Sequence, residues 1–187
     1  MLIVFEGIDG CGKSTQARML SKCIMPHQEV VFIKEPSEFV DIKSGTPKHF
    51  LEDRLKYSVP KIKAGLSRDM VVIMDRYYYS TMAYQSAKGY DLETIREENE
   101  EFCPAPDLLF IFDIDPQIAV RRITAKRKLD EWEMDIFYLY QVSRIYQDMD
   151  FMNYQVNIDA HASPFDVFEG IIETYSLYKR CIRRDKQ

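Results

Sequence analysis

The stretch Gly7-Ile8-Asp9-Gly10-Cys11-Gly12-Lys13-Ser14 decides the fold of this chain. It follows the apolar run at 2–5 and leads into helix-forming residues from Thr15 onward. A strand that enters a glycine-rich turn and then a helix makes the pattern G-x-x-x-x-G-K-[ST] a phosphate site, because backbone N–H groups and the positive end of the helix face one anion. Lys13 would then reach the β- and γ-phosphates, and the Ser14 hydroxyl would coordinate Mg²⁺. The sequence therefore predicts a nucleoside triphosphate site.

Length, composition and charge limit the other possibilities. A chain of 187 residues with 46% apolar residues suffices for a packed core, so we expect a single domain over residues 1–187. The net charge of −5 argues against a broad nucleic-acid or membrane surface. Too few apolar residues precede Glu6 for a secretory signal or a membrane span, and we expect a cytoplasmic protein without nucleic-acid or membrane partners. The four cysteines show no C-x-x-C pair, which favours neither zinc nor disulfides.

Apolar runs alternate with helix-forming segments along the chain. The runs predict buried strands at 2–6, 29–33, 70–74, 108–112 and 154–158. Helices are expected at 13–25, 48–57, 60–66, 80–87, 92–102, 115–124, 130–149 and 164–183. This alternation predicts an α/β, P-loop three-layer fold, in which a parallel sheet of about five strands carries helices on both faces. Ligands of such sheets bind at the carboxyl ends of the strands.

Charged residues follow the third predicted strand. At Asp75-Arg76 a carboxylate can hold Mg²⁺ and a guanidinium can clamp a phosphate. The alternative is an ion pair on the surface at a strand end. The binding of Mg²⁺ and phosphate is favoured over a surface ion pair, because the phosphate loop belongs to the same predicted sheet.

Aromatic residues stand at helical spacing in two places. Tyr77, Ser80 and Tyr84 can share one helical face, which either lines a pocket or belongs to a half-buried core. Phe50 and Arg54 lie four residues apart, so a ring and a guanidinium can together bind a nucleobase. On spacing alone, a position in the core is favoured for the aromatic residues of both groups.

Five cations lie within residues 121–128: Arg121, Arg122, Lys126, Arg127 and Lys128. A mobile basic segment can neutralise charge on a transferring phosphoryl group. A solvated helix end that carries cations is equally compatible with this pattern. We expect a lid around residues 124–131.

Together these segments resemble the thymidylate kinase family. The matching stretches are residues 5–16, Lys34-Glu35-Pro36, Asp75-Arg76-Tyr77 with Ser80 and Ala83-Tyr84-Gln85, and Pro106-Asp107-Leu108 with Asp113. They run in order from residue 1 to about 115, and the fit is looser beyond. The family transfers the γ-phosphate of ATP to thymidine monophosphate (dTMP) with Mg²⁺ and is usually a homodimer. The resemblance implies the same activity, cofactor and assembly for this chain.

The resemblance also implies which residues bind the substrates. Those for ATP are Gly7, Ile8, Asp9, Gly10, Cys11, Gly12, Lys13, Ser14 and Thr15. Those for dTMP are Asp9, Glu35, Phe50, Arg54, Arg76, Ser80, Thr81, Tyr84 and Gln85. Mg²⁺ would be held by Ser14 and Asp75.

Within the acceptor site the implied roles differ. Asp9 would face the 3′-hydroxyl of the sugar, and Arg76 would bind the acceptor phosphate. Phe50 would stack on thymine and Arg54 would bond to its edge. The hydroxyls of Ser80 and Thr81 would complete the base contact, and Gln85 would support the base pocket. Tyr84 would pack under the sugar, where a 2′-hydroxyl would need room.

The predicted catalytic residues are Lys13, Arg76 and Arg127. An acceptor phosphate is already an anionic nucleophile, so positioning and neutralisation of charge suffice without a strong general base. In the family a catalytic arginine lies either in the phosphate loop or in the lid. Because the loop has Cys11 at that position here, Arg127 or a neighbour is expected to act from the lid.

Two departures from the family pattern leave alternatives open. Ser37-Glu38 follows Glu35-Pro36 where many members have Gly-Gly, and the segment 36–50 is shorter than usual. Since that region helps to form the acceptor pocket, a nucleoside monophosphate kinase with relaxed base specificity is the alternative. A catalytically inactive nucleotide-binding protein is disfavoured because four residues of the site are all present: Lys13, Ser14, Asp75 and Arg76. A GTPase is disfavoured because no N/T-K-x-D motif occurs.

Overall fold

The computed structural model describes residues 1–151 and 154–185. Within them, five strands form one sheet in the order β2-β3-β1-β4-β5, and every neighbouring pair is parallel. The strands are β1 (Leu2–Gly7), β2 (Val30–Lys34), β3 (Val71–Asp75), β4 (Leu108–Asp113) and β5 (Gln155–Asp159). The predicted parallel sheet of about five strands is confirmed.

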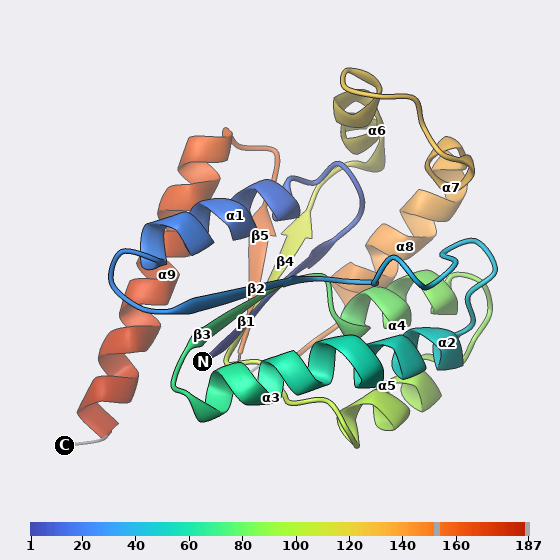
Figure 1. The fold of residues 1–187 in the computed structure, drawn as a ribbon. Coiled ribbons are helices and arrows are strands. Elements are labelled where there is room, and N and C mark those ends of the chain that lie inside the picture. Colours follow the sequence, from blue (N-terminus) through green and yellow to red (C-terminus); the bar gives the residue numbers. More distant parts are fainter. Residues whose placement is uncertain (152–153, 186–187) are drawn as a thin grey trace.

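Helices cover both faces of the sheet (Figure 1). On one face, α1 (Lys13–Ile24) packs beside α9 (Pro164–Asp185). The other face carries α3 (Val59–Ser67), α4 (Tyr78–Ser86), α5 (Leu92–Glu100) and α8 (Ile136–Asp148). The short helices α6 (Pro116–Thr124) and α7 (Glu131–Met134) stand beyond the carboxyl ends of the strands. The predicted three-layer arrangement is therefore confirmed.

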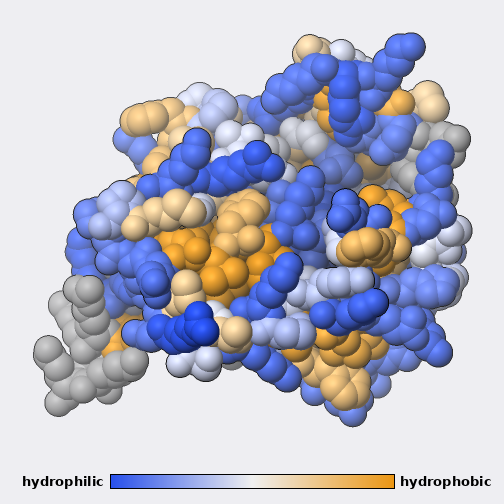
Figure 2. Space-filling view, viewed as in Figure 1, coloured by the Kyte–Doolittle hydropathy of each residue, from blue (hydrophilic) through white to orange (hydrophobic). Residues whose placement is uncertain are grey.

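The central strands and the edge strand differ in burial. Every residue of β1 and β3 is buried, as expected for strands covered on both faces. In the edge strand β2, Val30, Val31 and Phe32 are only partly buried. Figure 2 shows an apolar area over β2, between α1 and α3. Across the described residues, no helix combines the length and the apolar character that a membrane crossing requires.

The helix expected at 48–57 changes its type partway. It begins as α2 (Pro47–Asp53), where the Thr46 side chain accepts a hydrogen bond from the backbone N–H of His49. A π-helical turn, Arg54–Ser58, then leads into α3, and the Val59 N–H donates to the carbonyl of Arg54. Pro60 contributes to this break because it has no N–H to continue the α-helical ladder. Such turns often occur at functional sites, and this one begins at Arg54.

The single helix expected at 130–149 is wrong. The structure has α7 and then α8, with Asp135 between them. The Asp135 carboxylate accepts a hydrogen bond from the backbone N–H of Tyr138 at 3.0 Å and so caps α8. Aspartate stabilises a helix start better than a helix interior, which explains the division. As a result, α7 and α8 are separate helices that pack against each other.

Candidate active site

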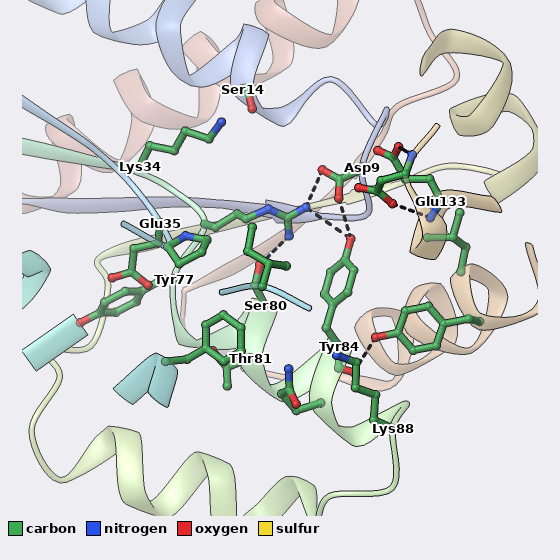
Figure 3. A pocket seen from close by; sticks show the side chains of 18 of the residues that line it. Asp9, Ser14, Lys34, Glu35, Tyr77, Ser80, Thr81, Tyr84, Lys88 and Glu133 are labelled. Atoms are coloured by element: carbon green, nitrogen blue, oxygen red, sulfur yellow. Dashed lines mark hydrogen bonds and ion pairs between the residues drawn. The ribbon is translucent and has the colours of Figure 1, made fainter. Parts of the chain in front are cut away.

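A cavity of about 290 Å³ lies at the carboxyl ends of β1, β2 and β3 (Figure 3). Side chains from the phosphate loop, from the helices α2, α4 and α8, and from the predicted lid line it. The lining includes all nine residues expected to bind the acceptor: Asp9, Glu35, Phe50, Arg54, Arg76, Ser80, Thr81, Tyr84 and Gln85. It also includes Ser14 and Arg127. The structure thus brings the predicted acceptor residues together, although their roles remain predictions.

The phosphate loop forms the turn between β1 and α1. Gly7, Gly10 and Gly12 have φ angles of 137°, 80° and 101°, in the region that disfavours a side chain. A Cβ atom at Gly10 would also lie only 2.4 Å from the carbonyl oxygen of Ala119. The Lys13 ammonium donates to the Ile8 carbonyl at 3.2 Å. The loop therefore requires its glycines and holds its own lysine.

Other residues of the loop have simpler surroundings. Cys11 is buried and Thr15 is exposed on α1. Burial raises the pKa of the Cys11 thiol, which disfavours a reactive thiolate. This supports the interpretation of Cys11 as a small residue that fills space.

Two side chains whose oxygen atoms could bind a metal ion meet where the phosphate loop faces β3. The Ser14 hydroxyl donates to Asp75 Oδ1 at 3.0 Å. Asp75 is fully buried, and its Oδ2 atom has no hydrogen-bond partner. A hydroxyl beside a buried carboxylate oxygen fits Mg²⁺, which binds few protein ligands and takes the rest from water and phosphates. Residues 1–151 and 154–185 contain no group of three or more acidic, histidine or cysteine side chains able to hold a metal.

Arg76 bonds to three polar side chains, Asp9, Ser80 and Tyr84, which Figure 3 labels. Its guanidinium donates to Asp9 Oδ1 at 2.7 Å, to Ser80 Oγ at 2.7 Å and to Tyr84 Oη at 3.3 Å. Its φ of 74° is uncommon for a residue other than glycine. Strained backbone of this kind is concentrated at functional sites.

Asp9 connects Arg76 with the phosphate loop. Its Oδ1 atom lies 3.4 Å from Lys13 Nζ and 2.7 Å from the Arg76 guanidinium. Removal from bulk solvent disfavours the charged carboxylate, but the charges of Arg76 and Lys13 outweigh this effect and hold the pKa of Asp9 below its ordinary value. One carboxylate therefore holds two cations within a few ångströms of each other.

Arg54 is fixed on every side of its guanidinium. It donates to Glu35 Oε2 at 2.8 Å, to Asn99 Oδ1 at 2.5 Å and to Thr81 Oγ1 at 3.1 Å. The guanidinium carbon also lies 5.6 Å from the centre of the Tyr77 ring. Burial raises the pKa of Glu35, and the Arg54 charge opposes that rise. Arg54 is therefore held in place before any ligand binds.

Arg127 comes from the predicted lid. Both of its terminal nitrogens contact the Glu133 carboxylate, one of them at 2.7 Å from Oε2. The backbone N–H of Asp130 donates to the same carboxylate at 2.8 Å. The side chain of Arg127 is 54% exposed, whereas that of Glu133 is 2% exposed. The other four cations of the segment are not among the lining residues of the cavity.

Comparisons with known proteins identify the family. A family model described as thymidylate kinase matches residues 46–171. A probable thymidylate kinase of Archaeoglobus fulgidus is 38% identical over 158 residues, which cover 78% of this chain and 80% of that protein. This chain belongs to the thymidylate kinase family. The thymidylate kinase of Akkermansia muciniphila is 39% identical over 72% of each chain, and that of Coprothermobacter proteolyticus is 32% identical over 95% of this chain and 100% of its own.

Several lining residues of this thymidylate kinase family member received no role from the sequence. They are Lys34, Pro36, Ile42, Lys88, Asp130, Glu133, Tyr138 and Leu139. Lys34 ends β2, so its position at the carboxyl end of a strand was a usable signal. The Tyr138 hydroxyl donates to the Tyr84 carbonyl at 2.8 Å across 54 residues of sequence, and no local pattern indicates that contact.

Proposed function

We propose that this chain is a thymidylate kinase that transfers the γ-phosphate of ATP to dTMP and releases dTDP and ADP. One observation carries the proposal beyond the family match. Asp9 contacts both Lys13 of the phosphate loop and Arg76 of the cavity. A donor phosphate on Lys13 and an acceptor phosphate on Arg76 would therefore be neighbours, as direct transfer requires.

The cavity would orient dTMP from its two ends. Arg76 would bind the phosphate, because a guanidinium pairs well with phosphate oxygens. Phe50 would stack on the base, and Arg54 and Thr81 would bond to its edge. The contacts of Arg54 with Glu35 and Asn99 support this role, because a donor that is already fixed selects among bases better than a mobile one.

The phosphate loop would bind ATP through its backbone N–H groups and Lys13. The Ser14 hydroxyl and the free oxygen of Asp75 would hold Mg²⁺. When bound, Mg²⁺ neutralises the charge of the β- and γ-phosphate oxygens.

The transfer itself would depend on charge and position. The acceptor phosphate oxygen attacks directly, so the chain need not remove a proton from a hydroxyl. Lys13, Arg76 and Arg127 would neutralise the negative charge that surrounds the transferring group. We propose that residues 1–187 act as one kinase domain and that residues 124–131 close over it as a lid.

The decisive experiment measures ADP release from ATP and Mg²⁺ with one acceptor at a time. The acceptors are dTMP, dUMP, dCMP and dGMP. We expect kcat/KM for dTMP to exceed that for dCMP and dGMP by about tenfold or more, because a fixed hydrogen-bond donor distinguishes the edges of these bases. The same margin over dUMP would come from its missing methyl group, because thymine and uracil have the same hydrogen-bonding edge. Comparable values for several acceptors would instead favour a nucleoside monophosphate kinase with relaxed base specificity. No turnover with any acceptor would favour an inactive nucleotide-binding protein.

We further propose a homodimer, on the strength of the family resemblance. Light scattering after size-exclusion chromatography, at several protein concentrations, would give the mass of the particle in solution. A mass equal to one chain at every concentration would contradict this proposal. Residence in the cytoplasm likewise remains a prediction.

A further inference from the structure

Glu6 is a fully buried carboxylate that directly precedes the phosphate loop. Its Oε1 atom accepts hydrogen bonds from the backbone N–H groups of Tyr77, at 2.7 Å, and Ser80, at 3.1 Å. Its Oε2 atom accepts from the hydroxyls of Ser80, at 2.6 Å, and Tyr146, at 2.9 Å. A carboxylate accepts about four hydrogen bonds, so Glu6 is saturated.

Two of these contacts are at the start of α4, the helix that carries the acceptor residues. Tyr77 is the N-cap residue of α4, and no side chain of its own makes the capping bond. Glu6, from the neighbouring strand β1, takes the place of such a cap, and it shares the Ser80 N–H with the Tyr77 carbonyl, which lies 3.1 Å from that nitrogen. Glu6 therefore connects the start of α4 with the strand that enters the phosphate loop.

The contacts of Glu6 also determine the orientation of the Ser80 hydroxyl. Ser80 has one hydroxyl proton, and it is donated to Glu6. The Ser80 oxygen then accepts from the Arg76 guanidinium at 2.7 Å, and the Tyr146 hydroxyl lies 3.0 Å from the same oxygen. The chain of contacts runs from the start of the phosphate loop through Glu6 and Ser80 to Arg76. This arrangement differs from the base contact that the family resemblance implies for Ser80.

We propose that Glu6 is a positioning residue, which acts through Ser80 to direct the Arg76 guanidinium toward the acceptor phosphate. Glu6 itself touches neither substrate. The inference rests on the proposed role of Arg76 as the phosphate-binding group. It adds a specific consequence: loss of Glu6 should weaken recognition of the acceptor phosphate and leave recognition of the nucleoside intact.

The test uses binding rather than turnover. Isothermal titration calorimetry gives the Kd of the full-length protein for dTMP and for thymidine, which lacks the phosphate. For Glu6→Gln we expect the ratio of Kd for thymidine to Kd for dTMP to fall by about tenfold or more, because hydrogen bonds to charged groups are among the strongest in proteins. The Kd for thymidine and the Kd for ATP should change by less than about twofold.

A second variant guards against misfolding of Glu6→Gln. Ser80→Ala removes the link between Glu6 and Arg76 with a smaller loss of contacts, and it should lower the same ratio. Because both residues act in one chain of contacts, the double variant should lower the ratio no further than the stronger single variant. If Ser80 instead contacts the base, Ser80→Ala would weaken thymidine and dTMP alike, and the proposal would be overturned.

Tyr79→Phe is the matched control. Tyr79 is also buried on α4, and its hydroxyl bonds to the hydroxyls of Tyr78, at 2.8 Å, and Tyr154, at 3.4 Å, away from Arg76. This control should lower the melting temperature without changing the ratio. The role of Glu6 would be overturned if the ratio of Kd for thymidine to Kd for dTMP fell equally in Tyr79→Phe and Glu6→Gln. It would also be overturned if this ratio were unchanged in Glu6→Gln.

The same measurements separate this inference from the proposed function. A wild-type protein that prefers dTMP over thymidine but releases no ADP with dTMP would contradict the kinase activity, and the ratio in Glu6→Gln would still test the positioning role. A wild-type protein without that preference would overturn the role of Arg76 and, with it, the inference.

Discussion

Arg54 and Arg127 line the same cavity but are held in opposite ways. The side chain of Arg54 is 3% exposed and bonds to Glu35, Thr81 and Asn99. These partners come from the segment after β2, from α4 and from α5. Arg127 is 54% exposed, and the side chain that binds it is Glu133 of α7, six residues away and just beyond the predicted lid. One arginine is fixed by the fold, and the other depends on its own short segment.

This difference matches the two tasks that a phosphoryl-transfer site must perform. A group that selects a base must be in place before the base arrives, because ordering it later would weaken binding. A group that neutralises the transferring phosphoryl group must leave room for the substrates and approach afterwards. Rigid attachment suits the first task, and attachment within a lid suits the second. The comparison thus predicts different consequences for the loss of each arginine.

The largest expected effect is on stability. Arg54→Met leaves the buried Glu35 carboxylate without its cation, so we expect a loss of about 3–5 kcal/mol in the free energy of unfolding. Urea unfolding followed by circular dichroism measures it. Adding Glu35→Gln to Arg54→Met should recover part of the loss, because the unpaired charge is then removed.

Arg127→Met is the matched comparison for stability. Arg127 is 54% exposed, and the buried Glu133 carboxylate would keep the hydrogen bond from the Asp130 N–H, so the expected loss is smaller than in Arg54→Met. If Arg54→Met and Arg127→Met lowered the free energy of unfolding equally, the two arginines would not differ in how firmly the fold holds them.

The second effect is on catalysis. We expect Arg127→Ala to lower kcat by at least about tenfold, because charge on the transferring group loses a partner, and to leave the Kd for dTMP nearly unchanged. Steady-state kinetics and calorimetry give the two values. Lys128→Ala, an exposed neighbour in the same segment, is the control and should change kcat little. An unchanged kcat in Arg127→Ala would refute a catalytic role for this residue.

The parts of the site that lie close together in sequence could be predicted from it. The phosphate loop and the stretch 75–85 each follow a strand, and the carboxyl ends of parallel strands meet at one edge of the sheet. This rule predicts that the residues directly after these strands meet at one edge, and they do line one cavity. The acceptor roles themselves came from the family resemblance, because spacing alone favours a core position for Tyr77 and Tyr84 as well as for Phe50.

The partners that hold these residues could not be predicted. Asn99 meets Arg54 across 45 residues, and Glu6 meets Tyr146 across 140. Such contacts depend on how α5 and α8 pack, and no local pattern encodes this packing. The division between α7 and α8 was missed for a related reason. A single aspartate at 135, among residues that favour helices, is a weak signal until its carboxylate is seen to cap Tyr138.

A third, smaller effect tests how Arg54 is fixed. Asn99→Leu keeps the side-chain volume but removes an acceptor of Arg54, while Glu35 and Thr81 remain. We expect KM for dTMP to rise about three- to tenfold with little change in kcat, because binding is lost rather than transition-state stabilisation. Glu98→Ala, an exposed change on the same helix, is the control. A fall in kcat at constant KM would show that Asn99 serves the chemical step instead.

The smallest effect concerns the attachment of Arg127 within the lid. Glu133→Gln keeps the shape of the side chain and removes its charge, so one of the two contacts with Arg127 is lost and the other is weakened. The lid arginine would then occupy its position on the cavity wall for less of the time. We expect kcat to fall about two- to fivefold, less than in Arg127→Ala, because the cation itself remains. In the Arg127→Ala background the same change should have no further effect, because Glu133 would act only through Arg127. A rise in kcat in Glu133→Gln would mean that Glu133 restrains Arg127 rather than presents it, and the comparison with Arg54 would then be between a fixed group and an inhibited one.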